Sequence, residues 1–143
     1  MNYKFYGNDN CDVSPINNIY NKIKNPKHLY DILSNIYSLD TCAPRLRHLW
    51  TKDNKTLGQC SITAFLVQDI FGGDVYGIRL EDGNYHCYNV IGNKKFDLTS
   101  EQFDYKLNYE DSELQLRENH FKKEEKYKRY LLLKNMLDKY IGL

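Results

Sequence analysis

The feature that most constrains the fold of this chain is a mainly apolar run, LGQCSITAFLVQDIFGG, at residues 57–73. Within residues 60–71 the apolar side chains recur at helical spacing and also fill most of the remaining circumference. A helix that is apolar on nearly all sides belongs in the middle of a globular domain rather than on its surface. The pair Gly72-Gly73 predicts its end, because glycine accepts the positive φ of a helix cap.

The first residue of this predicted helix is Cys60, which follows a turn at Gly58-Gln59. A side chain at a helix start lies beside free backbone N–H groups and the positive end of the helix dipole. That setting favours the thiolate, which is the nucleophilic form of cysteine. Cys60 is therefore a candidate nucleophile.

Length and charge indicate one domain that binds neither nucleic acid nor membrane. The 143 residues suit a single core, which we place in residues 13–143 after a loose lead-in at residues 1–12. With 20 Lys and Arg against 19 Asp and Glu, the chain lacks the basic excess of a nucleic-acid or membrane-surface binder. No apolar run approaches the ~20 residues of a membrane span, and the first residues lack the apolar stretch of a signal peptide. We expect a cytoplasmic protein.

Four cysteines, Cys11, Cys42, Cys60 and Cys87, are irregularly spaced and include no C-x-x-C motif. This pattern suggests reduced thiols in a cytosol rather than a disulfide framework. A structural zinc site is the alternative, and the spacing gives it little support. We expect no metal and no organic cofactor.

Helices are predicted on both sides of the central one. Cap signals at Ser14-Pro15 and Asn25-Pro26 start a short helix to about residue 24 and a second over 26–38. The second carries one apolar stripe, formed by Leu29, Ile32, Leu33, Ile36 and Tyr37. Residues 112–141 are predicted helical with a break near Asn119-His120. In this segment the run KKEEKYKR is taken as the solvated face, and the inner stripe is Tyr130, Leu133, Leu137, Tyr140 and Ile141.

After the central helix the apolar period changes from 3.6 to 2, which predicts strands over 75–80, 85–91 and 94–98. Asp82-Gly83 and Gly92-Asn93 supply the two turns. Residues 39–58 are predicted to be a long connection with room for one turn of helix, and residues 104–111 are predicted to be irregular. The fold class is therefore α+β, with the helix that bears Cys60 packed on an antiparallel β-meander between N- and C-terminal helices.

The second turn makes a geometric prediction. If Gly92-Asn93 is a two-residue hairpin loop, Tyr88 lies opposite Asp97, and His86, Tyr88 and Asp97 share one face of the sheet. His86 and Asp97 are then diagonal neighbours, with backbones roughly 7–8 Å apart, which a hydrogen bond between side chains can bridge. A three-residue loop would instead move Asp97 to the other face.

Other assignments of these residues are open. His48 is an alternative base, and Trp50 is either a wall of a cleft beside Cys60 or a core residue. His86 and Cys87 point to opposite faces of their strand, so they cannot both bind one metal ion with Cys60. Cys60 as a small buried hydrophobe and His86 as an ordinary core residue form the non-catalytic interpretation.

The segments GQCSITAFLVQDIFGGDVYGIRL, HCYNVIG and FDLTSEQF resemble the YunG-like family of small, largely uncharacterised bacterial proteins. The residues that match family motifs are Gly58, Gln59, Cys60, His86, Asp97, Leu98 and Thr99. Cys87 departs from the family pattern, where an aromatic residue is expected after the histidine.

The order of Cys60, His86 and Asp97 along the chain is also similar to that of papain-like and transglutaminase-like proteins. This resemblance implies that Cys60 is the nucleophile, His86 the base and then the acid, and Asp97 the orienter of the imidazole. The implied activity is a hydrolase or acyltransferase that forms a thioester with a peptide or small-molecule acyl substrate. Gln59 is adjacent to the cysteine, unlike the oxyanion glutamine of papain-like enzymes, so the Cys60 N–H and one unidentified donor would stabilise the oxyanion.

Two other functions compete with catalysis. A non-catalytic member of the same fold would use the cleft between residues 39–58 and the sheet to bind a peptide or small molecule. A structural or partner-binding protein would use the long C-terminal helix as its interface.

Overall fold

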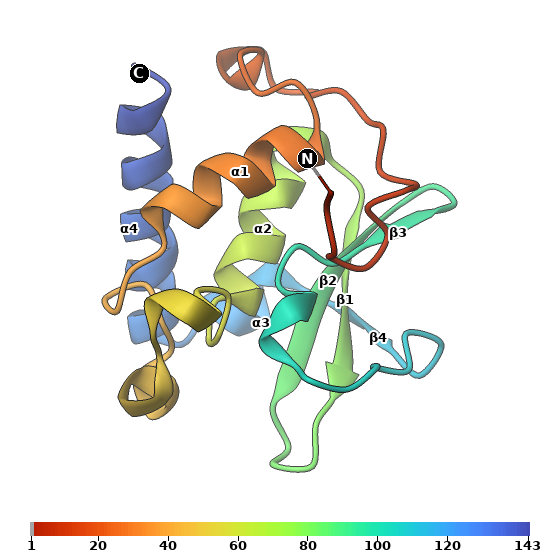
Figure 1. Ribbon diagram of the computed structural model, residues 1–143, viewed down its shortest axis with the longest axis vertical. Helices are drawn as coiled ribbons and strands as arrows, with labels where there is room; N and C mark the ends of the chain where they lie inside the picture. The colour runs from red at the N-terminus through yellow and green to blue at the C-terminus, as the bar shows by residue number, and fades with distance from the viewer. Residues whose placement is uncertain (1) are drawn as a thin grey trace.

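The computed structural model describes residues 2–143, in which helices lie to one side of a four-stranded antiparallel sheet (Figure 1). The sheet has the order β3-β2-β1-β4, and its strands are β1 (Asp74–Arg79), β2 (Tyr85–Ile91), β3 (Lys94–Phe96) and β4 (Glu113–Gln115). The α-helices are α1 (Pro26–Ile36), α2 (Cys60–Phe71), α3 (Arg117–Phe121) and α4 (Glu124–Tyr140). The predicted α+β class is confirmed.

Helix α2 occupies the centre of the molecule, between the sheet and helices α1 and α4 (Figure 1). It begins at Cys60 and ends at Phe71, as the sequence predicts, and its only partly exposed residues are Cys60, Gln68 and Asp69. Gly72 and Gly73 follow with φ of 84° and 74°. The Asn89 side chain donates a hydrogen bond of 2.9 Å to the Ala64 carbonyl, which fixes β2 against the middle of α2.

The register of the meander confirms the predicted second turn. Ile91 pairs with Lys94 and Asn89 with Phe96, so Gly92-Asn93 is a two-residue loop. Cys87 belongs to the main core against α2, whereas Tyr88 belongs to a smaller cluster on the opposite face. That smaller cluster consists of Ile78, Tyr88 and Tyr109.

The C-terminal segment differs from the prediction of one helical region. Residues 113–115 form β4, an edge strand paired with β1, and the helices separate at Lys122 and Lys123 rather than at Asn119-His120. The glycine at position 77 allows β4 to pack here, because a Cβ on this residue would lie 2.9 Å from the Gln115 side chain. Gly77 thus leaves room for Gln115 to lie across β1, a contact that no local pattern encodes.

Two other expectations for the ends of the chain are wrong. Residues 2–12 are not a loose lead-in, since Phe5 is fully buried and Tyr6 forms a β-bridge with Asp97; Met1 lies outside the described residues. The short helix predicted to run to residue 24 is reduced to a 3-10 turn at Asn18–Tyr20, capped by the Asn17 side chain.

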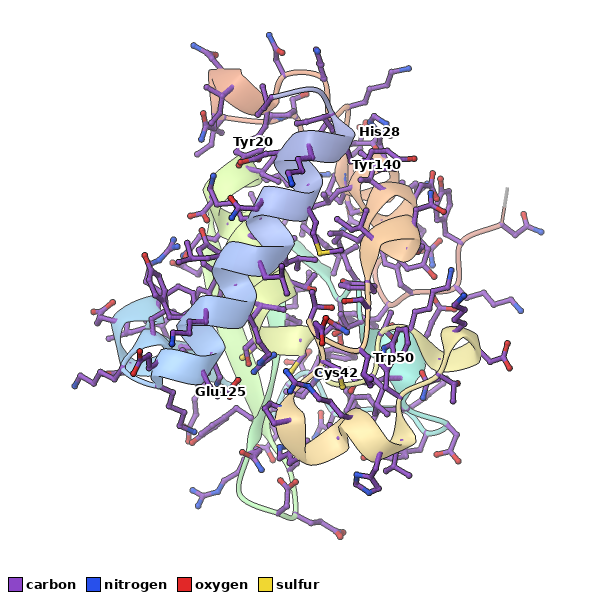
Figure 2. The ribbon with its side chains drawn as sticks, turned by 90° about the vertical axis from the view of Figure 1, so that its left-hand side faces the viewer. Tyr20, His28, Cys42, Trp50, Glu125 and Tyr140 are labelled. Atoms are coloured by element: carbon purple, nitrogen blue, oxygen red, sulfur yellow. The ribbon has the colours of Figure 1, made fainter. Side chains whose placement is uncertain are left out.

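Only part of the inner stripe predicted for helix α4 is buried. Tyr130, Leu133 and Leu137 are buried, but Tyr140 is 54% exposed. Figure 2 labels Glu125 and Tyr140 near the two ends of this helix. The charged run before Tyr130 is not wholly solvated either, because Arg129 is only 7% exposed and donates to the Thr41 carbonyl at 3.1 Å.

Within residues 2–143, no helix is both long enough and apolar enough to cross a membrane.

Candidate active site

Cys60 opens on a cleft of about 860 Å³. The walls of this cleft come from the start of α2, the β1–β2 hairpin, the connection after residue 42, and the start of α4. Cys60 is half-buried, whereas Cys11, Cys42 and Cys87 are buried. Cys60 is therefore the thiol that a dissolved molecule can reach most readily.

His86 is fully buried on β2 and lines the same cleft. Its Nε2 lies 2.6 Å from Oδ2 of Asp97, so the predicted hydrogen bond between these two side chains is present. The edge of the Phe103 ring packs on the imidazole, with ring centroids 4.8 Å apart. Carboxylate and aromatic ring together fix the orientation of His86.

Asp97 is itself held in place by several donors. Its Oδ1 accepts from the backbone N–H of Thr99 at 3.1 Å and from the Thr99 hydroxyl at 3.3 Å. Its Oδ2 accepts from the Tyr109 hydroxyl at 2.7 Å as well as from His86. A buried carboxylate that accepts this many hydrogen bonds is held in one position.

The pKa values of the Cys60 thiol and the His86 imidazole differ from those of isolated side chains. Burial alone would raise the pKa of Cys60, but the nearby imidazole of His86 and the backbone N–H of Cys87 lower that pKa to about 7. Burial opposes the charged form of His86, yet the Asp97 carboxylate and the Cys60 sulfur raise its pKa to about 10. The second ring nitrogen, Nδ1, is buried and bonds to no other described group. These shifts favour a thiolate–imidazolium pair at neutral pH.

Three residues that the sequence places near Cys60 or His86 do not line the cleft. The Gln59 side chain is buried and donates to the Ser38 carbonyl at 3.3 Å. Trp50 lies half-buried on the connection that also holds Cys42 (Figure 2), and its Nε1 donates to the Lys55 carbonyl at 3.0 Å. Tyr88 is buried on the far face of the sheet, where its hydroxyl donates to the Tyr109 carbonyl. His48 is exposed and lies outside the cleft.

Other residues at the site were not predicted from the sequence. Tyr109 contacts Asp97, Phe103 contacts His86, and His120 and Lys126 also line the cleft. The alternation of Tyr105, Leu107 and Tyr109 was a signal for a segment with one face on the sheet. The contact between Tyr109 and Asp97 depends on how residues 103–111 cross that sheet, which no local pattern specifies.

Among residues 2–143, no three His, Cys, Asp or Glu side chains cluster as metal ligands. The fold and site define an α+β domain in which a thiol at a helix start faces a buried histidine–carboxylate pair. The family model described as YunG protein matches residues 25–142, so the chain belongs to the YunG family. The resemblance seen in the sequence is confirmed at this level.

One relative is "Uncharacterized protein YunG" of Bacillus subtilis (strain 168), which is 39% identical over 61 residues. That alignment covers 43% of this chain and 52% of the relative, so it spans about half the length of the relative. No solved structure matches the chain.

Proposed function

We propose that this protein is a cysteine-dependent hydrolase or acyltransferase that works through a thioester on Cys60. The observation that carries the proposal is the 2.6 Å pair of His86 and Asp97 beside a cleft-facing thiol whose pKa is lowered to about 7. A nucleophile, a base and a group that orients the base are the three parts that covalent acyl transfer needs.

The reaction begins when the Cys60 thiolate attacks the substrate carbonyl and forms a tetrahedral oxyanion. His86, protonated before the attack, donates its proton to the leaving amine or alcohol, and the acyl group remains on sulfur as a thioester. Water or an amine then attacks the thioester while His86 takes up its proton. The second tetrahedral species releases the acid or amide and returns the sulfur as a thiolate beside imidazolium.

The donors for the oxyanion come from the start of α2. Gln59 precedes the helix and makes no side-chain hydrogen bond to its first turn, which leaves the backbone N–H groups there without a capping side chain. The Cys60 N–H is the donor next to the sulfur, and it acts together with the positive end of the helix dipole. Gln59 itself has no part in this step, because its amide is turned to Ser38.

The order of the three residues and their placement on a helix start and an antiparallel sheet support a relation to papain-like and transglutaminase-like enzymes. Both classes use this chemistry, and the choice between water and amine as acceptor separates them. Within the proposal, the cleft of about 860 Å³ is large enough for a short peptide or a small acyl compound.

Acylation by p-nitrophenyl acetate tests the proposal. We expect release of p-nitrophenolate and an acetyl group on Cys60 by peptide mass spectrometry. His86→Ala is expected to lower the acylation rate by about 10²-fold or more, because it removes the proton-transfer group. Cys11→Ser, a buried position outside the cleft, is the matched control and should retain the wild-type rate.

A contradictory outcome would be acetylation that spreads over several nucleophiles, or that proceeds equally fast without His86. Either result would leave the cleft as a binding site without catalysis.

A further inference from the structure

The cleft beside Cys60 contains more positive than negative charge that is free of a partner. Arg45 pairs with Asp82 at 3.2 Å, and Arg129 pairs with Glu125 at 2.5 Å. Apart from the Cys60–His86 pair, the remaining charged residues of the cleft are Lys123 and Lys126. Neither of these two lysine ammonium groups forms an ion pair with a carboxylate of residues 2–143.

Lys126 is held in position by a directed chain of hydrogen bonds. Gln115 donates its amide N–H to the Glu113 carbonyl at 3.2 Å, which leaves Oε1 to accept from Nε2 of His120 at 2.7 Å. Because Nε2 carries the proton, Nδ1 of His120 is the acceptor for the Lys126 ammonium at 2.9 Å. Burial, together with Lys126 and Lys123, lowers the pKa of His120 to about 4, so the ring stays neutral and keeps accepting.

The Lys126 ammonium has three N–H donors, and His120 accepts only one of them. The side chain is half-buried in the cleft wall, so the other two donors lose part of their hydration. Burial lowers the pKa of Lys126, and the Cys87 and Cys60 sulfurs oppose that lowering. The cleft that contains the Cys60 sulfur therefore also contains a positioned cation with donors to spare.

We infer that Lys126, assisted by Lys123 at the rim, is a subsite for a carboxylate carried by the acyl substrate. This inference rests on the proposed function and names its substrate class: acyl compounds with a negative charge near the reacting carbonyl. A single carboxylate fits better than a doubly charged phosphate, because Glu124 and Glu125 flank the subsite in the first turn of α4. Lys provides one point charge here, because the two arginines that line the cleft among the described residues, Arg45 and Arg129, already pair with carboxylates and are not free to form a bidentate clamp.

The first test measures binding without chemistry. Glutarate is added to the Cys60→Ser protein, and amide and lysine resonances are followed by NMR. We expect shifts concentrated at Lys126 and His120, and a loss of affinity of about tenfold in Lys126→Met. The control is Lys139→Met, because Lys139 lies on the same helix, is exposed and does not line the cleft. Equal affinity in the two variants would overturn the subsite.

The second test compares the alkylation of Cys60 by iodoacetate and by iodoacetamide. In Lys126→Met, the rate ratio of the anionic to the neutral reagent should fall by about tenfold, while Lys139→Met keeps the wild-type ratio. An equal fall for both reagents would mean that Lys126 acts only on the thiolate, and would overturn the subsite. If neither reagent modifies Cys60 in the wild type, the proposed function fails, and glutarate binding still decides the subsite.

Discussion

Asp97 is 1% exposed, yet its carboxylate oxygens accept hydrogen bonds from His86, Thr99 and Tyr109. The backbone of Asp97 is also fixed, because its N–H donates to the Tyr6 carbonyl at 2.9 Å. A carboxylate held from both sides can orient an imidazole without moving when the charge on the ring changes. Through Tyr109, the smaller cluster of Ile78, Tyr88 and Tyr109 contributes to this rigidity of the candidate site.

Tyr109→Phe tests that contribution at the scale of one atom. The substitution removes the 2.7 Å hydrogen bond to Asp97 but keeps the ring that stacks on Tyr6. We expect the free energy of unfolding to fall by about 1–3 kcal/mol, because a hydrogen bond to a buried charged group is lost. Urea denaturation gives the value. Tyr105→Phe is the control, since Tyr105 is 60% exposed and should change stability by less than about 0.5 kcal/mol. Equal effects would show that the hydroxyl of Tyr109 is not part of the network.

At the scale of elements, the start of α2 depends on Gly58. This residue has φ of 74°, and a Cβ on it would lie 2.6 Å from the Cys42 sulfur. Its carbonyl accepts from the Ala43 N–H at 2.9 Å, so it also joins the connection after residue 42 to the helix start. Gly58 therefore sets the place from which Cys60 enters the cleft.

Gly58→Ala is expected to destabilise the protein more than Gly83→Ala does. Both positions have positive φ, but a Cβ on Gly83, where φ is 86°, would meet no other atom within 4 Å. The free energy of unfolding should fall by only about 1–2 kcal/mol in Gly83→Ala, because of the backbone conformation alone. It should fall by about 2 kcal/mol more in Gly58→Ala, because the new methyl group overlaps Cys42. Chemical denaturation of both variants measures the difference. Equal losses would contradict this account of the helix start.

At the scale of helices and strands, some features can be predicted from the sequence and others cannot. Helix α2 and the hairpin register followed from local signals, the apolar circumference of residues 60–71 and the two-residue turn at Gly92-Asn93. Strand β4 was missed because it depends on Gln115 lying over Gly77, a contact between segments far apart in the chain. The geometry between His86 and Asp97 could be derived because one turn fixes it, whereas the cleft wall of His120 and Lys126 needs the tertiary fold.

At the scale of the whole molecule, His120 makes stability depend on pH. Its pKa is lowered from 6.5 to about 4 in the folded protein, so the unfolded chain binds more protons between these values. The contribution of His120 to stability is therefore present above pH 6.5 and is lost as the pH falls through about 4. We expect a slope of at most ~1.4 kcal/mol per pH unit in this range.

Urea denaturation between pH 4 and pH 7 checks this dependence. His120→Gln should flatten the profile, because glutamine does not titrate but can still accept from Lys126. His48→Gln, at an exposed position, should keep the profile of the wild type. An unchanged profile in His120→Gln would assign the acid sensitivity to other groups.

The central claim is that His86 activates the Cys60 thiol, and the pH dependence of its alkylation tests that claim most directly. The rate of Cys60 modification by iodoacetamide is followed from pH 5 to pH 10 by peptide mass spectrometry. The account predicts a titration near the pKa of about 7, and a shift of that titration to or above the ordinary thiol value of 9.0 in His86→Ala. A wild-type thiol that titrates at 9 or above, unchanged when His86 is replaced, would contradict it.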